Sequence, residues 1–485
     1  MGAARDPHVP RVIVVGGGLA GLAAASVLGM RGFRVTLLES RPHLGGRASS
    51  FVDHVTGEVV DNCQHVSMGC CTNLAEFCRR VGIDRFFRRD RTLHFIDADG
   101  RRSDLGPSKV PAPFHFTPGF LRLKFLDGAS KIAVGRGLAR LARLPQDGRW
   151  NERPFSEWLA AQRQPAQAVD RFWSTVLTSA LGEECGRIDP AYARKVFVDG
   201  FLANQASSDV LLPTAPLGAL YGGRLVEWMK RHGVEIRMGC AVRGLMFRDG
   251  RVEGLQLRDG TTLESDAYLV AVPFDRLLGL LPREVVDGEP YFSRLRELRS
   301  APITGVHLWF DRPITPLPHA ILLGRTSQWI FNRSALWADG QNADGTGGGE
   351  SFEGYYYQIV VSASYELAGL SHDDLTRRVV RELGEIWPVC RGARLMHARV
   401  VTERSAVLSV RPGVDALRPS QRSPVDNLWL AGDWTDTGWP ATMEGAVRSG
   451  NLAAESMLAR YGREERILAP DLPVGFWARV LLGRP

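Results

Sequence analysis

Lysine is scarce in this chain: five of its 60 basic residues are lysine and the others are arginine. The arginines are spread along the whole sequence, and no run of five or more basic residues occurs. Proteins that bind nucleic acids usually gather their basic residues on one face or in one segment. We therefore expect no nucleic-acid partner, although the net charge of +7 would suit an anionic lipid surface.

Long apolar segments are also missing. The opening residues, MGAARDPHVP, lack the apolar stretch of a secretion signal. The longest uncharged run, Val12–Met30, is just long enough to span a bilayer, but its closely placed glycines and the preceding Val-Ile-Val-Val favour a strand and a turn. We expect a cytoplasmic protein, in which the seven cysteines are reduced.

Four of these cysteines and a histidine crowd into residues 59–78, VVDNCQHVSMGCCTNLAEFC. Both residue types can bind zinc, but a closed zinc site needs four convergent ligands. Cys78 is expected on the buried face of a helix that Asn73 opens, with Glu76 completing a capping box. We therefore expect no metal, and interpret the stretch as a loop followed by a helix.

A strand, a glycine turn, a helix and a second strand are predicted in order over residues 11–40. The pattern G-x-G-x-x-G between a strand and a helix, with an acid 23 residues after the first glycine, predicts a dinucleotide-binding βαβ unit. The helix amino terminus would face the pyrophosphate, and the acid would bind a ribose, which disfavours NADP. The expected cofactor contacts are Gly16, Gly18, Leu19, Ala20, Gly21, Glu39 and Ser40.

Residues 41–50, RPHLGGRASS, resemble the second glycine motif of the flavin amine oxidase and phytoene desaturase superfamily. Adjacent glycines let the backbone pass close to a ligand, and arginine supplies phosphate-directed donors. Residues 222–273, with Arg-Asp-Gly turns at 248–250 and 258–260, are similar to the meander that returns the chain to the flavin domain in that superfamily. The resemblance implies that FAD is the cofactor and that it contacts Arg41, Gly45, Gly46, Arg47 and the backbone of Val242.

Residues 427–450, NLWLAGDWTDTGWPATMEGAVRSG, resemble the last FAD motif of the superfamily, most closely its carotenoid and squalene-associated desaturase version. A helix is expected from about Met443 to Tyr461, and its amino terminus would place partial positive charge at the flavin pyrimidine. The implied cofactor contacts are Gly432, Asp433, Pro440, Ala441, Thr442, Met443 and Ala446.

Because the FAD motifs lie at opposite ends of 485 residues, the domains must be interleaved. We expect an α/β fold: a Rossmann-like FAD-binding domain of the amine oxidase type, with an inserted α+β substrate domain that contains a mixed sheet and helices. The expected ranges are 1–105, 205–275 and 400–462 for the FAD domain, 106–204 and 276–399 for the substrate domain, and 463–485 for a tail.

Three substrates compete. Amine oxidases of the superfamily place an aromatic residue just before Met-Glu-Gly-Ala-Val, as one wall of a cage around the amine. Here that position is Thr442, so the physical basis of amine recognition is weakened. A long isoprenoid is favoured instead, as a carotenoid to be desaturated or as hydroxysqualene. A flavin-binding protein without turnover remains a further alternative.

The middle of the chain points to one family. Residues 172–222, which include ASSDVLLP at 206–213, and the run Asp61-Asn62-Cys63-Gln64-His65 resemble hydroxysqualene dehydroxylase, the squalene-associated FAD-dependent desaturase. The resemblance implies reductive removal of a hydroxyl group in squalene and hopanoid synthesis. Cys63 departs from the family, which has glycine at this position, and would strain the loop if that glycine requires positive φ.

Loss of a hydroxyl group needs a general acid near the leaving oxygen. Asp61 and His65 are the candidates, since their loop follows the second glycine motif toward the flavin, and Asp209 is a third. A hydrogen-bonded structural Asp–His pair is the alternative interpretation of the first two.

Electrons must come from an external donor, since no second strand–GxGxxG–helix unit appears in the sequence. The segment Val110–Leu144 and the end of the tail, LPVGFWARVLLGRP, combine apolar and aromatic residues with arginines. Phe476, Trp477, Val480, Leu481 and Leu482 would form an apolar surface beside Arg479 and Arg484. We expect peripheral contact with the cytoplasmic face of a membrane, from which a hydrophobic isoprenoid could enter.

Overall fold

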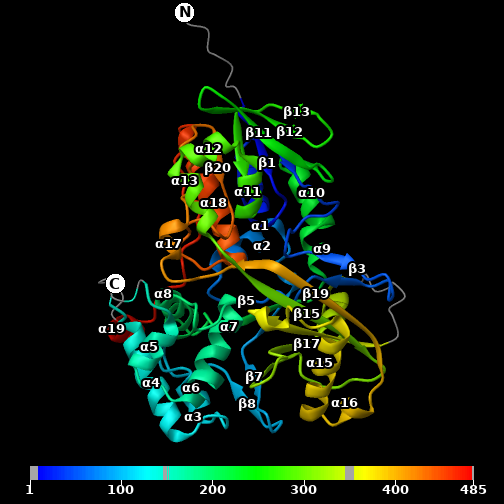
Figure 1. Ribbon diagram of the computed structural model, residues 1–485, viewed down its shortest axis with the longest axis vertical. Coiled ribbons are helices and arrows are strands. Elements are labelled where there is room, and N and C mark those ends of the chain that lie inside the picture. The colour runs from blue at the N-terminus through cyan, green and yellow to red at the C-terminus, as the bar shows by residue number, and fades with distance from the viewer. Residues whose placement is uncertain (1–8, 146–149, 151, 345–353, 483–485) are drawn as a thin grey trace, which may run out of the picture.

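The computed structural model describes residues 9–145, 150, 152–344 and 354–482, and these form two lobes (Figure 1). One lobe holds a parallel sheet, and the other holds a mixed sheet and a group of helices. Each sheet is assembled from segments far apart in the sequence, because the chain passes repeatedly between the lobes. The predicted fold class, a Rossmann-like domain with an inserted α+β domain, is confirmed.

The first sheet contains five strands, all paired in parallel. The strands Arg11–Val15, Ala267–Val270 and Leu428–Leu430 are near-continuous apolar runs, as expected for a parallel sheet that is covered on both faces, whereas the edge strand Val234–Arg237 alternates apolar and charged residues. In spatial order they are β10 (Val234–Arg237), β2 (Arg34–Leu38), β1 (Arg11–Val15), β14 (Ala267–Val270) and β20 (Leu428–Leu430).

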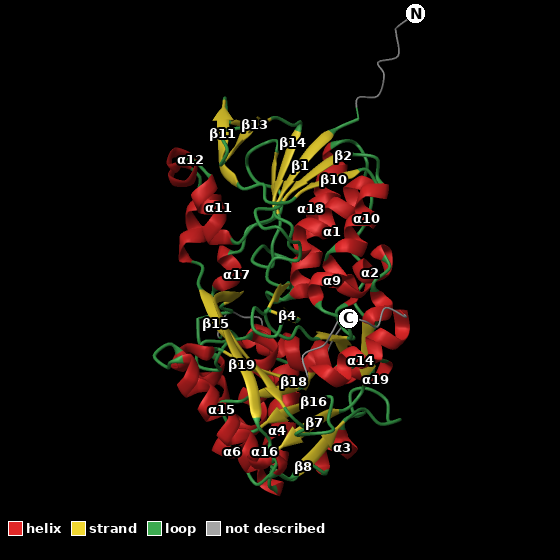
Figure 2. Cartoon of the chain, turned by 90° about the vertical axis from the view of Figure 1, so that its right-hand side faces the viewer, coloured by secondary structure: helices red, strands yellow, loops and turns green. Residues whose placement is uncertain are grey.

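Helices cover one face of this sheet (Figure 2), where Val12 and Val14 of β1 point into their core. A Cβ added at Gly450 would lie 2.2 Å from the carbonyl oxygen of Ala20, so small residues permit the close contact of two of these helices. The helices are α1 (Leu19–Met30), α2 (Thr72–Val81), α9 (Leu217–Tyr221), α10 (Gly223–Arg231) and α18 (Met443–Arg460).

The predicted meander covers the opposite face, where Ile13 and Val15 point. Both predicted turns are confirmed: Asp249 and Gly250 have φ of 50° and 73°, and Gly260 has φ of 90°. The meander consists of β11 (Val242–Arg248), β12 (Arg251–Leu257) and β13 (Thr262–Leu263), followed by α11 (Phe274–Leu280), α12 (Arg283–Gly288), α13 (Pro290–Ser293) and η4 (Arg294–Glu297).

The second sheet has seven strands, and β16 and β7 form its one parallel pair. Helix α15 (His372–Ile386) and the short α16 (Val389–Gly392) pack on one face of it. In spatial order the strands are β19 (Leu395–Leu408), β15 (Ser300–Phe310), β18 (Tyr355–Ser362), β17 (Trp329–Asn332), β16 (His319–Leu322), β7 (Leu93–Ile96) and β8 (Arg102–Leu105).

The sheets divide the chain differently from the predicted ranges at three places. Strands β7 and β8, placed in the predicted FAD range 1–105, belong to the seven-stranded sheet. Strand β19 stays in that sheet as far as Leu408, beyond the predicted boundary at 400. Helix α11 packs on the meander, although most of it lies beyond the predicted boundary at 275. Which domain a segment belongs to is decided by the spatial order of the strands, and local sequence patterns do not record that order.

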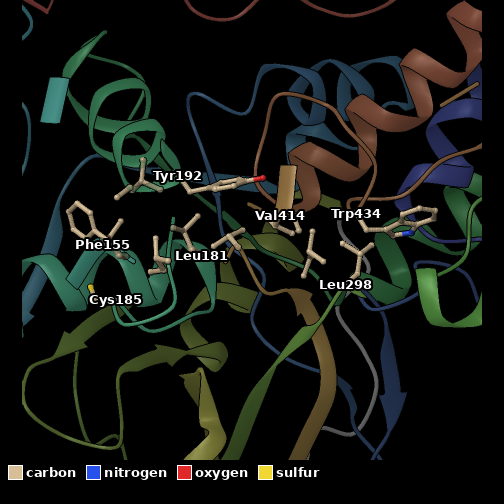
Figure 3. Packing of buried hydrophobic residues seen from close by; sticks show 14 of the residues in the cluster. Phe155, Leu181, Cys185, Tyr192, Leu298, Val414 and Trp434 are labelled. Carbon is tan, nitrogen blue, oxygen red and sulfur yellow. The ribbon is translucent and has the colours of Figure 1, made fainter. Parts of the chain in front are cut away.

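A group of helices packs beside the seven-stranded sheet. Figure 3 shows part of an apolar cluster that continues from Phe155 and Cys185 in this group through Tyr192 and Val414 to Trp434. The two lobes therefore share a core. The group contains α3 (Thr117–Leu121), α4 (Gly128–Ala142), α5 (Phe155–Ala161), α6 (Ala166–Ala168), α7 (Thr175–Leu181), α8 (Pro190–Arg194) and two π-helical segments, η2 (Val169–Ser174) and η3 (Lys195–Leu202).

Short elements complete the fold. They are the hairpin β3 (Ser50–Val52) and β4 (Val59–Asp61), the small sheet of β5 (Ser67–Met68), β9 (Val210–Pro213) and β6 (Phe87–Asp90), and the helical segments η1 (Asp84–Phe86), α14 (Arg333–Asp344), η5 (Ser364–Leu367) and α17 (Val414–Leu417).

The tail ends in α19 (Phe476–Leu482), which packs against the helical group. Leu482 is buried together with Ala112 and Ala142, so its predicted place on an exposed apolar surface is wrong. Arg484 lies outside the described residues. None of the helices described is long and apolar enough to cross a membrane.

Candidate active site

Two glycine loops from different strands meet above the parallel sheet. Gly16, Gly45 and Gly46 have φ of 109°, 99° and 62°, a region that side chains disfavour. The amide of Gly45 donates to the carbonyl oxygen of Gly17 at 2.8 Å, and a Cβ on Gly46 would lie 3.1 Å from the Cα of Gly18. The two loops thus form one cradle in which their backbones approach closely.

Helix α1 begins at this cradle, with Gly18 at its N-cap and Leu19 as its first residue. No acidic residue stands in its first turn, so its positive end is available to an anion. A Cβ on Gly21 would lie 2.0 Å from the carbonyl oxygen of Gly16, which explains the need for glycine at this contact. Leu19 and Ala20 are buried beside it. The predicted pyrophosphate site is therefore geometrically intact.

Glu39 follows β2 and is buried. Its Oε2 accepts from the Gly17 amide, and its Oε1 accepts from the Arg41 amide, both at 2.8 Å. The Ser40 hydroxyl donates to the same Oε1 at 3.1 Å. These donors hold the carboxylate at the edge of the cradle. The Cys240 amide donates to the Glu39 carbonyl oxygen at 2.8 Å, so the start of the β11 strand, Val242, lies close to the predicted ribose site.

The second glycine loop is tied to the carboxy-terminal motif. The Arg47 guanidinium donates to Asp433 Oδ1 and to the Ala406 carbonyl oxygen, both at 2.6 Å. Arg47 was predicted to donate to phosphate. In the structure it orients the carboxylate of Asp433, the group predicted to bind the ribityl chain. Gly432, with φ of 156°, could not carry a side chain, because a Cβ would lie 2.3 Å from the Trp434 indole nitrogen.

The carboxy-terminal helix α18 begins at Met443, as predicted, and Thr442 caps it by accepting from the Gly445 amide at 3.2 Å. Its first amides lack intrahelical acceptors and would face the flavin. A Cβ on Gly445 would lie 2.4 Å from the Pro440 carbonyl oxygen, so the loop returns closely on the helix. Ala441 and Ala446 flank this turn. Cradle, carboxylate and helix terminus form one continuous site that suits FAD.

Glu444 fixes the start of α18 against α2. Its carboxylate is buried and accepts from the amides of Leu74 at 2.7 Å and Asn73 at 3.1 Å. The predicted capping box is therefore wrong: α2 begins at Thr72, one residue earlier, and the Asn73 side chain bonds Glu444. Cys78 lies on the buried face of α2, as predicted.

Asp61 ends β4 and is fully buried. It accepts hydrogen bonds from the Ser50 hydroxyl at 2.7 Å and the Leu217 amide at 2.8 Å, and it forms an ion pair with Arg333 at 2.7 Å. Arg333 is also fully buried and donates to Gln64. These three buried contacts occupy the carboxylate and favour a structural role over the predicted one as an acid.

His65 is half-buried, and its Nδ1 lies 2.9 Å from the Cys63 carbonyl oxygen. A carbonyl only accepts, so Nδ1 carries the proton and Nε2 is an acceptor in the neutral ring. Burial lowers the pKa of His65, which favours this neutral form. The histidine is thus better suited to accept a proton than to donate one. Among the described contacts His65 makes none with Asp61, so the alternative interpretation, a hydrogen-bonded Asp–His pair, is not seen.

Cys63 does not have the positive φ for which glycine would be needed, since the described non-glycine residues with positive φ are Arg163, Asp249 and Ala363. Burial raises the pKa of its thiol to about 12. The strain considered for this loop is therefore absent, and the thiol stays protonated.

Asp209 lies in the small β5–β9–β6 sheet region, where Arg89 and Arg91 approach it at 3.5 Å. Its partners differ from those of Asp61, so the third predicted acid belongs to a separate cluster. Within the described part of the chain, no group of three or more His, Cys, Asp or Glu residues could hold a metal ion.

Sequence reasoning missed the polar face of the seven-stranded sheet beneath this loop. Tyr356 and His307 bond through the tyrosine hydroxyl and Nδ1 at 2.7 Å, and His307 Nε2 lies 3.3 Å from Gln358. Burial lowers the pKa of His307 to about 3. The available signal was period-two alternation, since His307 and Trp309, like Tyr356 and Gln358, are two residues apart on one face of a strand.

Sequence similarity to carotenoid desaturases covers nearly the whole chain. The 15-cis-phytoene desaturase of Synechococcus elongatus is 27% identical over 480 residues, covering 94% of this chain and 97% of the relative. The zeta-carotene desaturase of Synechocystis sp. is 27% identical over 484 residues, covering 93% and 98%.

Solved structures agree in fold. An oxidoreductase from Methanosarcina mazei matches with a TM-score of 0.69 at 14% identity, covering 93% of this chain and all of that one. Cyclohexylamine oxidase from Brevibacterium oxydans matches with a TM-score of 0.65 at 16% identity, covering 94% and 100%. The model of the family described as flavin containing amine oxidoreductase matches residues 19–458. Together with the geometry of the cradle, this match shows that the chain is an FAD-dependent oxidoreductase and belongs to the flavin-containing amine oxidoreductase family.

Proposed function

We propose that the protein reduces hydroxysqualene to squalene, removing its hydroxyl group in a step of squalene and hopanoid synthesis. The observation that carries this proposal is the position of the loop Asp61–His65, whose sequence resembles the dehydroxylases. Asn62 donates to the Ser49 hydroxyl at 3.1 Å in the second glycine loop, while Arg333 of α14 holds Asp61 from the other lobe. The distinguishing motif thus spans the junction of flavin cradle and substrate sheet.

Carotenoid desaturation is the second candidate. It is favoured by the named relatives, which include phytoene and zeta-carotene desaturases at 25–28% identity. Both candidates act on a long isoprenoid, and they differ in whether the substrate carries an oxygen. Amine oxidation is disfavoured because Thr442, in the position of the cage aromatic, is engaged in capping α18.

The chain's own residues would bind and orient the cofactor. The cradle and the start of α1 would hold the pyrophosphate, Glu39 would hold the ribose, and Asp433, which Arg47 orients, would bind the ribityl chain. The amino terminus of α18 stabilises negative charge on the pyrimidine ring. Reduced FAD, when bound, supplies hydride chemistry. One dinucleotide motif is evident in the sequence, so we propose that the reducing electrons come from an external donor.

A surface on the helical group would give access to lipid. We define it as the apolar–basic face, formed by the loop before α3, by α3, α4 and α19. The Lys131 ammonium donates to the Leu121 carbonyl oxygen at 2.7 Å, and Arg143 donates to the Leu481 carbonyl oxygen at 3.0 Å, which joins these elements. Its exposed apolar side chains are Val110, Phe114, Leu121, Ile132, Phe476, Trp477 and Val480.

We propose that the apolar–basic face binds the cytoplasmic side of an anionic membrane. Exposed aromatic residues next to arginines suit the interface between headgroups and acyl chains. Phe476→Ser with Trp477→Ser should lower binding to vesicles of phosphatidylglycerol and phosphatidylcholine several-fold in a flotation assay. Tyr355→Ser, an exposed aromatic change in β18, is the matched control. Equal binding of both variants would contradict the proposal.

The reaction can be tested directly. The dithionite-reduced holoenzyme is incubated anaerobically with hydroxysqualene, and the oxidised holoenzyme is incubated separately with phytoene. Squalene from the first and no desaturated product from the second is expected. The opposite pattern would establish the desaturase, and neither product from a flavin-loaded enzyme would favour a binding protein without turnover.

A further inference from the structure

Trp439 occupies an unusual position in the loop before the flavin helix. It lies three residues before the cap Thr442, and its side chain is 8% exposed. Two cations flank its ring: Lys195 Nζ is 4.5 Å from the ring centroid, and Arg448 Cζ is 5.0 Å from it. Among the described residues, none accepts a hydrogen bond from the buried indole nitrogen. An indole N–H is therefore held in place without an acceptor.

Lys195 comes from the other lobe, at the start of the π-helical segment η3. Its ammonium lies 3.0 Å from Asp199 Oδ2, one turn along the same segment. The side chains of Lys195 and Asp199 are 23% and 13% exposed, so both are largely shielded from water. π-Helical turns are rare and are often found at functional sites. The segment thus presents a partly buried cation to the loop that leads into the flavin helix.

Arg448, the second cation, is already bound. It lies one turn into α18 and donates to Asp471 at 2.8 Å and to Glu444 at 3.4 Å. It therefore serves to fix the indole ring, whereas Lys195 has N–H donors to spare beyond Asp199. The lysine ammonium therefore lies over the ring that carries the indole N–H, so two donors are close to each other.

A buried N–H without an acceptor is unfavourable. Such a donor, fixed between two cations beside the flavin helix, suits a ligand that brings an oxygen acceptor. A carotene precursor or squalene is a hydrocarbon and has none, whereas an isoprenoid alcohol does. An unpaired donor at Trp439 therefore suits hydroxysqualene, which carries an oxygen acceptor, better than a carotene precursor, which carries none.

We propose that Trp439 and Lys195 form a hydroxyl subsite, in which the indole N–H binds the oxygen of an isoprenoid alcohol and Lys195 protonates that oxygen as it leaves. This inference rests on the proposed dehydroxylation. It assigns the acid role to Lys195, since Asp61 is paired with Arg333 and the Nε2 of neutral His65 is an acceptor.

The step balances as follows. The C–O bond breaks with its electron pair on oxygen, and the Lys195 ammonium gives that oxygen a proton, so water leaves. The carbon takes hydride from the two-electron-reduced flavin, which is thereby oxidised, and a C–H bond replaces the C–O bond. The neutral amine regains its proton from solvent, and Asp199 stabilises the ammonium that results.

Binding tests the subsite without turnover. The oxidised holoenzyme is titrated with hydroxysqualene and with squalene in the same detergent, and binding is followed by equilibrium dialysis. Trp439→Phe keeps a ring between the cations but removes the N–H, so its affinity for hydroxysqualene should fall about tenfold. Its affinity for squalene should be unchanged. Trp228→Phe, on α10, is the matched control and should alter neither affinity.

Equal losses for both ligands would overturn the hydroxyl role of Trp439. Loss of bound flavin in Trp439→Phe, read from the ratio of flavin to protein absorbance, would also overturn it by assigning the N–H to the cofactor. These binding results stand whether or not squalene is formed. The binding titration can therefore contradict the subsite even if squalene is formed, and it can support the subsite even if no squalene is formed.

Two changes at Lys195 separate its roles. Lys195→Arg keeps the charge over the ring but does not release a proton, so hydroxysqualene binding should persist while the single-turnover rate of the reduced enzyme falls at least 100-fold. Lys195→Met should lower both binding and rate. Lys230→Arg, on α10, is the control and should change neither. A Lys195→Arg enzyme with the wild-type rate would exclude Lys195 as the acid.

Discussion

In the flavin cradle the two glycine loops meet through backbone atoms, whereas the loop that faces the cradle is joined to the other lobe through side chains. Gly16, Gly45 and Gly46 bring amides together through conformations that other residues disfavour. Asp61 and Gln64 in the loop are instead held by Arg333, about 270 residues away in the sequence. The cradle should therefore be sensitive to any side chain added at its glycines, and the loop should be sensitive to the loss of the Arg333 charge.

The largest effect is expected at the tightest contact of the cradle. Gly21→Ala places a Cβ 2.0 Å from the Gly16 carbonyl oxygen, a distance that forces α1 away from β1. We expect the purified variant to lose essentially all bound FAD, measured by flavin absorbance per protein. Gly135→Ala on α4, where a Cβ meets no atom within 4 Å, is the control. That control should keep its flavin and gain up to about 1 kcal/mol of stability.

Full FAD occupancy in Gly21→Ala would contradict the idea that close backbone packing in the cradle is required for FAD binding. It would mean that the backbone can relax at this contact, and that side chains also decide cofactor binding.

The next effect is expected in the loop. Arg333→Met removes one partner of a fully buried ion pair and leaves the Asp61 charge uncompensated. The free energy of unfolding should fall by about 3–5 kcal/mol, measured by urea denaturation of the holoenzyme. Arg312→Met removes an exposed partner of Asp311 and should cost less than about 1 kcal/mol. Similar losses for the two variants would show that the buried pair does not hold the loop.

The two regions also differ in how far the sequence predicted them. The strand, glycine turn, helix and acid of the amino-terminal unit lie within 30 residues, so spacing alone predicted their arrangement. That Gly432 and the start of α18 contact the same cofactor as the amino-terminal unit was implied only by the resemblance. The Arg47–Asp433 bond was not anticipated, because its partners are 386 residues apart.

The loop could not be predicted in the same way. Its motif was recognised, but the assignment of Asp61 as an acid required knowledge of its neighbours. Arg333 lies on α14, and nothing in its local sequence indicates that it is buried against Asp61. The same limit applied to β7 and β8, whose place in the second sheet depends on pairing with β16. Long-range pairing is a property of packing, which short patterns do not record.

A smaller effect is expected at Glu39, the side chain that completes the backbone cradle. Glu39→Gln replaces one carboxylate oxygen by an amide group that cannot accept from both the Gly17 and Arg41 amides. FAD affinity should fall about tenfold, measured as the flavin retained after dialysis. Glu235→Gln, on the exposed edge strand β10, is the control. Retention equal to that of the control would remove Glu39 from the ribose site.

The smallest effect is expected at Cys63, the position at which the hydroxysqualene dehydroxylases that this loop resembles have glycine. Cys63→Gly requires no change of backbone conformation, because Cys63 lacks a positive φ. Glycine adds conformational freedom to the unfolded chain, so stability should fall by about 1 kcal/mol, measured by thermal unfolding. Flavin occupancy and the rate of the proposed dehydroxylation should stay within twofold of the wild type, since the thiol is protonated and the loop is held by Arg333. A tenfold change in rate would instead place Cys63 in contact with substrate, and the loop would then be part of the reacting site.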